Sequence, residues 1–155
     1  LIEDGAPVLG IVYAPVRNRL FIGNSNGAEE ITTTKDHAIG TRRGIAVRVH
    51  GPERVAVCSR SHKNPETEKF LNDNRINSCV SIGSSLKFCL IASGEADIYP
   101  RFGPTMEWDT AAGHAIARAA GMEIYQAGKE EPLQYNKEDL LNPWFIVEPK
   151  HTEIK

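Results

Sequence analysis

The alternation of apolar and polar residues predicts a series of hairpins at the start of the chain. Residues 1–13 predict a hairpin that turns at Glu3-Asp4-Gly5 and returns along the apolar stretch Val8–Tyr13. Residues 18–32 predict a second pair of strands, because Asn26-Gly27 is a strong turn signal between two apolar runs. We therefore expect the chain to open in an antiparallel sheet. An apolar first residue inside a hairpin also leads us to expect further residues upstream.

Residues 32–44 are polar and punctuated by glycine, which predicts a surface loop or linker. We place a domain boundary there. Residues 1–44 would be the end of an N-terminal sheet domain with its linker, and residues 45–155 would be a C-terminal α/β domain.

From residue 53 onward, strand patterns alternate with helix patterns. The start of the first helix is well marked, because Asn64 can cap it and Pro65 suits the first helical position. The expected helices are 64–74, 84–94 and 107–121, and the expected strands are 53–59, 75–83, 95–101, 122–126 and 144–149. This alternation predicts the α/β class, with helices on the faces of a sheet.

Composition excludes several classes of protein. The net charge is -2 and no run of Lys or Arg stands out, so nonspecific binding of nucleic acid or of a membrane surface has no electrostatic basis. No apolar stretch is long enough to span a bilayer. The odd number of cysteines (Cys58, Cys79 and Cys89) and their spacing argue against a disulfide framework or a zinc site. We expect three free thiols and a cytoplasmic protein, with peripheral association at the inner membrane as an alternative.

Three loops between strands and helices carry candidate chemistry, because ligands of α/β sheets gather at the carboxyl ends of strands. The first is Ser59–His62, for which we favour a solvated polar loop when the stretch is taken alone. The second is Gly83–Lys87, whose hydroxyls and cation favour an anion, although Lys87 could simply reach into water. The third carries Arg101 and leads to Asp109, which is either a helix cap or a metal ligand. Together the loops predict a phosphate site beside one carboxylate.

The helix behind Asp109 is built mainly from small residues. Ala112, Ile116, Ala119 and Ala120 follow helical spacing on one face. Small side chains allow two layers to approach closely, so we expect this face to pack tightly and to hold the start of the helix rigidly.

The segment WDTAAGHAIARAAG resembles the second signature, W-D-x-A-A-G, of the inositol monophosphatase-like superfamily of Mg²⁺-dependent, lithium-sensitive phosphatases. Met122 stands where many members have the second of two glycines. The segment LIEDGAPVLGIVYAPV is similar to the stretch after the superfamily's first signature, D-P-[LI]-D-G-T, which this chain lacks. The resemblance covers essentially the whole chain. It implies the C-terminal portion of the layered α/β/α/β/α sugar-phosphatase fold.

Within the superfamily, the segments SRSH, GSSLKFC and DIYPR resemble the 3'(2'),5'-bisphosphate nucleotidases of bacterial sulfur assimilation. This resemblance implies hydrolysis of adenosine 3',5'-bisphosphate to AMP and phosphate. It implies Asp109 as a Mg²⁺ ligand, and a substrate site formed by His62, Ser84, Lys87, Arg101 and Asp109.

The remaining metal ligands and the group that positions the attacking water would lie in an N-terminal part of the same protein. We therefore expect the 155-residue chain alone to be inactive. Two alternatives stay open. One is an inositol monophosphatase or related sugar phosphatase, and the other is a fragment that only binds nucleotides or serves as an interaction module.

Overall fold

The computed structural model describes residues 1–48, 53–59 and 64–150 of the chain. The chain opens in a short antiparallel pair, β1 (Ile2–Glu3) and β2 (Ala6–Pro7), whose turn residues Asp4 and Gly5 both have positive φ. The predicted first turn is therefore confirmed. The return strand is divided, however, because β3 (Gly10–Ala14) leaves this pair and joins the next strand.

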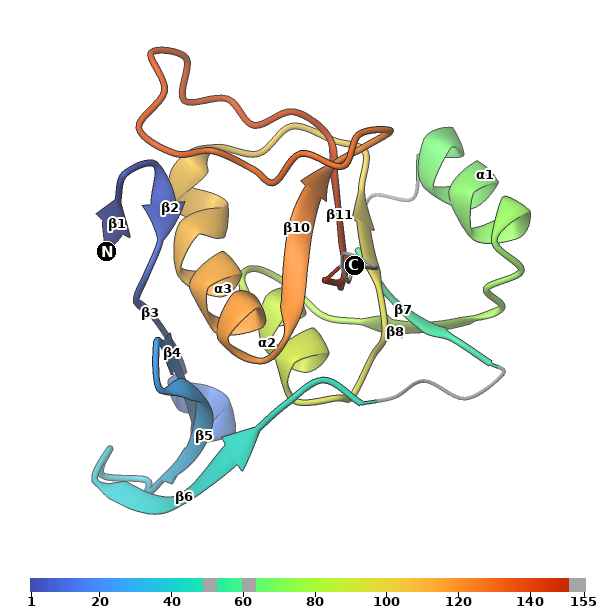
Figure 1. Cartoon of the computed structure of the whole chain (residues 1–155). Helices are drawn as coiled ribbons and strands as arrows, with labels where there is room; N and C mark the ends of the chain where they lie inside the picture. The colour runs from blue at the N-terminus through green and yellow to red at the C-terminus, as the bar shows by residue number, and fades with distance from the viewer. Residues whose placement is uncertain (49–52, 60–63, 151–155) are drawn as a thin grey trace, which may run out of the picture.

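A four-stranded antiparallel sheet follows, in the order β3-β4-β5-β6 (Figure 1). A short 3-10 helix, Pro15–Arg17, precedes β4 (Arg19–Asn24), and β5 is Gly27–Thr33. The predicted second strand pair is thus confirmed.

The prediction of a loop or linker over residues 32–44 is wrong for its second half, because β6 (Ile39–Ile45) pairs with β5. This edge strand is exposed along almost its whole length, so it lacks the apolar alternation by which a strand is recognised. Ion pairs with β5 help to hold it: Arg42 binds Glu29 at 2.7 Å and Arg43 binds Glu30 at 2.5 Å. The proposed domain boundary near residue 44 stays a prediction.

The second half of the chain is an α/β layer, as predicted. Strands β7 (Val55–Cys58) and β8 (Ser78–Ser81) are parallel. Strands β9 (Tyr99–Arg101), β10 (Met122–Gln126) and β11 (Phe145–Pro149) form an antiparallel sheet in the order β10-β11-β9. A parallel bridge between Ala56 and Ile98 connects the two groups of strands.

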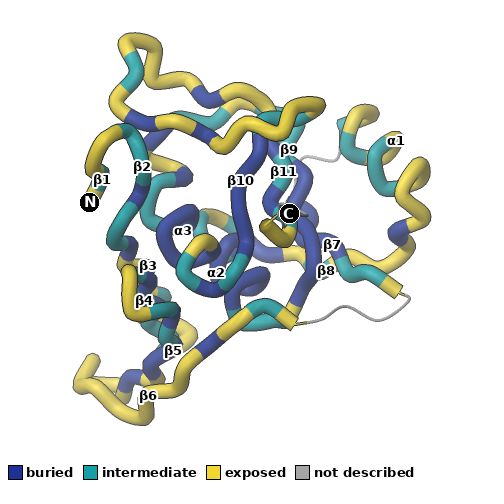
Figure 2. Tube along the Cα trace, in the orientation of Figure 1, coloured by how far each residue is buried: buried dark blue, intermediate teal, exposed yellow. Residues whose placement is uncertain are grey.

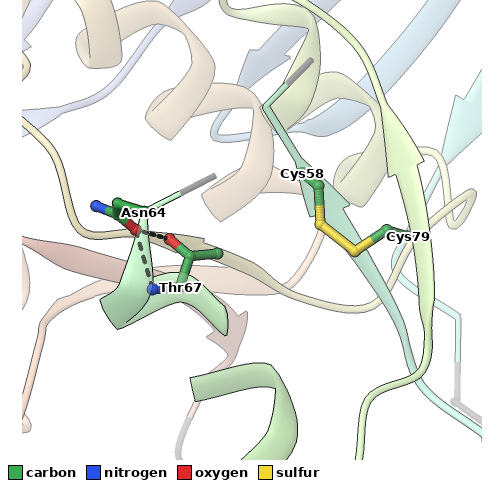
Figure 3. Close-up of a disulfide and its surroundings, with 4 residues drawn as sticks. All are labelled: Cys58, Asn64, Thr67 and Cys79. Carbon is green, nitrogen blue, oxygen red and sulfur yellow. Dashed lines mark hydrogen bonds between the residues drawn. A yellow bond between two sulfur atoms is a disulfide. The ribbon is translucent and has the colours of Figure 1, made fainter. Parts of the chain in front are cut away.

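All three predicted helices are present: α1 (Pro65–Asp73), α2 (Leu86–Ala92) and α3 (Glu107–Ala119). The cap predicted for α1 is confirmed, because the Asn64 side chain accepts a hydrogen bond from the Thr67 backbone N–H at 2.9 Å (Figure 3). Within the described ranges, no helix combines the length and the apolar character that crossing a bilayer would require.

Helices α2 and α3 lie between the four-stranded sheet β3-β4-β5-β6 and the strands of the α/β layer. Helix α1 lies on the opposite side of those α/β strands (Figure 1). The buried parts of the chain concentrate around these two helices (Figure 2). Helix α3 packs very closely against the four-stranded sheet β3-β4-β5-β6. A Cβ added at Gly10 would lie 2.1 Å from the Ala112 carbonyl oxygen, and one at Gly23 would lie 2.4 Å from Ile116 Cα. The tight packing predicted for the face with Ala112 and Ile116 is therefore confirmed.

The expectation of three free cysteines is wrong for two of them. Cys58 and Cys79 form a disulfide between β7 and β8, with their Cα atoms 5.8 Å apart (Figure 3). The two cysteines are 21 positions apart in the sequence, and only the parallel pairing of β7 and β8 brings them together. Cys89 is free and buried, and burial raises the pKa of its thiol to about 12.

Candidate functional site

A cavity of about 380 Å³ opens where the starts of α2 and α3 meet the end of β9. We call it the phosphate cavity. Four of the five site residues predicted from the sequence lie on it, and the fifth, His62, lies outside the described residues. Its lining comprises Ser59, Gly83, Ser84, Ser85, Lys87, Phe88, Tyr99, Arg101, Pro104, Thr105, Asp109, Thr110 and Phe145.

The start of α2 contributes hydroxyls and a buried cation. Ser84 has a φ of 59°, a left-handed conformation that turns the chain sharply before the helix. Lys87 is only 7% exposed, and its Nζ lies 3.5 Å from the Ser84 carbonyl oxygen and 5.7 Å from the centre of the Tyr99 ring. Burial lowers the pKa of Lys87, and the nearby charge of Arg101 acts in the same direction. A buried cation with so few partners is well suited to an anion.

Arg101 is the last residue of β9, as it is of the predicted strand. Its Nη2 donates a hydrogen bond to the Pro104 carbonyl oxygen at 3.2 Å. Its Nε is buried and has no hydrogen-bond partner among the described residues. A buried N–H without a partner costs free energy, and an anionic ligand in the cavity would recover it.

Asp109 is both exposed at the cavity and part of the start of α3. It occupies the third helical position, and Met106 is the N-cap residue. The Met106 backbone N–H donates to Asp109 Oδ2 at 2.8 Å. The sequence alternatives of cap and ligand therefore do not exclude each other, because the hydrogen bond from Met106 uses Oδ2, one of the two carboxylate oxygens.

The donor set fits a metal ion only in part. Among the residues that the structure describes, no three or more His, Cys, Asp or Glu side chains gather where they could hold a metal ion. Mg²⁺ is commonly bound through one or two carboxylates together with phosphate oxygens and water. Asp109 can be one such ligand, but it does not make a metal site by itself.

A second cavity, also of about 380 Å³, adjoins the first and shares Ser59, Tyr99, Arg101 and Pro104 with it. We call it the side cavity. Rings form much of its wall, from Tyr99, Pro100, Phe102 and Pro104. Arg101 lines both cavities, so a ligand with a charged and an aromatic part could occupy both and contact the same guanidinium group.

Sequence reasoning missed two threonines of the phosphate cavity, Thr105 and Thr110. Thr110 follows Asp109 directly and is 1% exposed. Threonine is common at helix starts for structural reasons, so its position in the sequence gave little reason to select it. Its burial among polar partners is visible only in the folded chain.

The arrangement offers the chemical groups that phosphate binding requires. It brings together two cations, several hydroxyls and one carboxylate on one wall of the fold. Cations and hydroxyls hold phosphate oxygens, and a carboxylate nearby can hold a cation that bridges to them.

Known proteins are similar to this chain in sequence and in fold. The sequence profile of the inositol monophosphatase family matches residues 1–153. The 3'(2'),5'-bisphosphate nucleotidase CysQ of Escherichia coli strain K12 is 47% identical over 148 residues, which are 95% of this chain and 57% of that protein. The chain therefore spans little more than half the length of this relative.

Solved structures agree with the sequence matches. The crystal structure of CysQ from Bacteroides thetaiotaomicron, described as a bacterial member of the inositol monophosphatase family, is 48% identical. It superposes with a TM-score of 0.86, covering 97% of this chain and 61% of that one. A staphylococcal IMPase-II superposes with a TM-score of 0.71 over 96% of this chain and 54% of that one, at 19% identity, which shows the common fold alone.

Proposed function

The chain belongs to the inositol monophosphatase family, and from this premise we propose that the whole protein removes the 3'-phosphate of adenosine 3',5'-bisphosphate. In this reaction water attacks the phosphorus atom, the bond from phosphorus to the 3'-oxygen breaks, and AMP and phosphate are released. The relatives named 3'(2'),5'-bisphosphate nucleotidase support this choice of substrate.

The observation that carries the proposal is the presence of two cations, Lys87 and Arg101, on the same cavity as Asp109. One phosphate of a bisphosphate must lie where it is hydrolysed, and the other must be neutralised by the protein. Lys87 and Arg101 can supply that neutralisation, and Ser84 can donate a hydroxyl to the same oxygens. We assign His62 to the same substrate site from the resemblance alone.

The side cavity supports a nucleotide rather than a simple sugar phosphate. A nucleoside carries an aromatic base, and the side cavity presents the rings of Tyr99 and Phe102 beside the shared guanidinium of Arg101. Planar rings and guanidinium groups stack favourably on a base. We place the base in the side cavity and the phosphates in the phosphate cavity.

We further propose that Asp109 is a ligand of Mg²⁺ in the whole protein. A bound Mg²⁺ neutralises phosphate charge and makes a coordinated water more acidic. Asp109 would hold the ion beside the phosphate, Lys87 and Arg101 would fix the substrate's other charges, and the close packing of α3 would keep Asp109 in place. The remaining ligands would come from outside the described residues.

Steady-state kinetics of the whole protein on two substrates tests the proposal. We expect Lys87→Ala and Arg101→Ala each to lower kcat/KM for adenosine 3',5'-bisphosphate. A lost hydrogen bond to a charged group is worth about 1.5–3 kcal/mol, which is roughly ten- to a hundredfold in kcat/KM. Activity on a monophosphate such as inositol 1-phosphate should change much less. Lys69→Ala is the control, because Lys69 lies exposed on α1 in an ion pair with Asp73.

Two results would count against the proposal. If the wild-type protein releases no phosphate from adenosine 3',5'-bisphosphate, the function is wrong. If both variants lose activity equally on the two substrates, Lys87 and Arg101 serve the phosphate that is hydrolysed, and a monophosphatase becomes the better description.

A further inference from the structure

A stripe of buried polar residues runs along one face of helix α3. Glu107, Thr110 and His114 are spaced at i, i+3 and i+7, which places them on one face, and all three are buried. The face meets residues 135–142, which are part of the connection between β10 and β11. Near the start of the helix, the Glu107 carboxylate accepts the backbone N–H groups of Asn136 at 2.8 Å and of Lys137 at 3.1 Å.

The centre of this contact is the hydroxyl of Tyr135. It lies 2.9 Å from His114 Nδ1 and 3.1 Å from Thr110 Oγ1, so one hydroxyl joins two successive turns of α3. Asn142 Nδ2 donates to Thr110 Oγ1 at 3.1 Å and to Thr105 Oγ1 at 3.2 Å. Thr105 and Thr110 line the phosphate cavity, whereas His114 and Tyr135 do not. The hydrogen bonds therefore lead from the cavity wall into the core.

The other side of the His114 ring is also held. His114 Nε2 lies 2.5 Å from Glu123 Oε1 on β10, and Glu123 Oε2 lies 3.6 Å from Arg118 Nε. Burial lowers the pKa of His114, and the neighbouring Glu123 carboxylate acts in the opposite direction. Glu123 of β10 holds Nε2 and the Tyr135 hydroxyl holds Nδ1, so the imidazole has a single orientation.

We propose that His114 is a positioning residue of the phosphate cavity. Through the Tyr135 hydroxyl it fixes Thr110, and with it the first turn of α3 that carries Asp109. This inference rests on the proposed function, because it assigns a role within the same site. The His114 ring thereby sets the position of the Asp109 carboxylate, although the two side chains are not in contact. Asp109 and Thr110 are adjacent, so a shift of one displaces the other.

The test compares variants that cut the chain of hydrogen bonds at chosen points in the whole protein. Tyr135→Phe removes only the hydroxyl. His114→Asn carries an amide near the position of Nδ1 and can keep the bond to Tyr135, whereas His114→Gln carries its amide near Nε2 and can keep only the bond to Glu123. The control is Tyr13→Phe. Tyr13 also joins a histidine and a threonine, His37 at 2.6 Å and Thr33 at 3.3 Å, but on the antiparallel sheet.

We expect Tyr135→Phe and His114→Gln to lower kcat/KM by about 10–100-fold, the usual cost of losing a group that orients a ligand. The Mg²⁺ concentration for half-maximal activity should rise, and so should the Kd for Mg²⁺ measured by calorimetry in the presence of AMP. His114→Asn should stay closer to the wild type, and Tyr13→Phe should match it. Melting temperatures are measured for every variant, so that loss of folding is recognised.

A wild-type Mg²⁺ response in a folded Tyr135→Phe protein would overturn the inference. Equal losses in His114→Asn and His114→Gln would also overturn it, because the bond to Tyr135 would then be irrelevant. The proposed function fails separately, through an inactive wild type. In that case the calorimetric Kd values of the same variants for Mg²⁺ still decide whether His114 positions Asp109.

Discussion

Replacing Gly23 by alanine tests whether the close approach of α3 to the antiparallel sheet holds the site in place. A Cβ at Gly23 would lie 2.4 Å from Ile116 Cα and 2.8 Å from the Ala115 carbonyl oxygen. Both are backbone atoms of α3, so no rotation of a side chain can relieve the clash. Ordinary contact begins near 3.4 Å, so the helix must withdraw by 3.4 − 2.4 = 1.0 Å.

The structure indicates both the cost in stability and the cost in activity. Overpacking of this kind typically costs about 1–3 kcal/mol. For a chain of this size each kcal/mol lowers the melting temperature by roughly 2–4 °C, so the expected fall is about 2–12 °C. Because α3 carries Asp109 and Thr110, the same displacement moves them relative to Lys87 and Arg101. A misplacement of about 1 Å can lower the rate by roughly a hundredfold.

The assay pairs thermal melts of the 155-residue chain with kinetics of the whole protein. Gly44→Ala is the matched control, since Gly44 lies in β6 of the same sheet and a Cβ there meets nothing within 4 Å. We expect Gly44→Ala to melt and react like the wild type. Equal melting temperatures of Gly23→Ala and Gly44→Ala would show that the close approach does not contribute to stability. Full activity of a destabilised Gly23→Ala protein, at a temperature where it is folded, would show that the close approach does not position the site.

Three further outcomes are expected. Asp109→Asn should lower the activity of the whole protein by orders of magnitude with little change in melting temperature, because asparagine can still accept the hydrogen bond from Met106; unchanged activity would make Asp109 structural. Lys87→Met should raise the melting temperature at neutral pH while weakening use of adenosine 3',5'-bisphosphate to a similar degree as Lys87→Ala. Burial lowers the pKa of Lys87 in the folded wild type, so the unfolded chain holds the proton more tightly. The stability of the wild type should therefore increase as the pH rises from that lowered pKa toward the ordinary 10.5. Thermal melts of Lys87→Met at neutral and alkaline pH should lack this increase. The purified 155-residue chain should release no phosphate from adenosine 3',5'-bisphosphate in the presence of Mg²⁺; measurable release from a sample of verified mass contradicts this.

Much of the candidate site followed from local rules. Ser84 lies just before α2, Lys87 lies in the first turn of α2, and Arg101 ends β9. All three are near the ends of predicted strands, and these ends converge at one edge of a sheet, so their meeting on one cavity was predictable. Asp109 was identified from its place at a helix start. The roles of these residues stay a prediction, as does that of His62.

Two predictions were wrong for a common reason: the loop over residues 32–44 and the three free cysteines. The strand over residues 39–45 is exposed, so its existence depends on pairing with β5 rather than on its own pattern. The bond between Cys58 and Cys79 depends in the same way on the neighbouring position of β7 and β8. β5 directly precedes β6, whereas Cys79 lies 21 positions after Cys58, but in both cases the pattern of the segment itself carries no information about its partner.

By itself the sequence determined the elements whose signals are local, the α/β class, and the helix of small residues behind Asp109. Periodicity, caps and turns act over a few residues, and they can be recognised without knowing the rest of the chain. Only the tertiary structure decided that the Tyr135 hydroxyl lies between His114 and Thr110, and that Arg101 lines two cavities. A buried polar side chain needs a partner, but the partner is chosen by the packing of layers, and that choice is made across the whole fold.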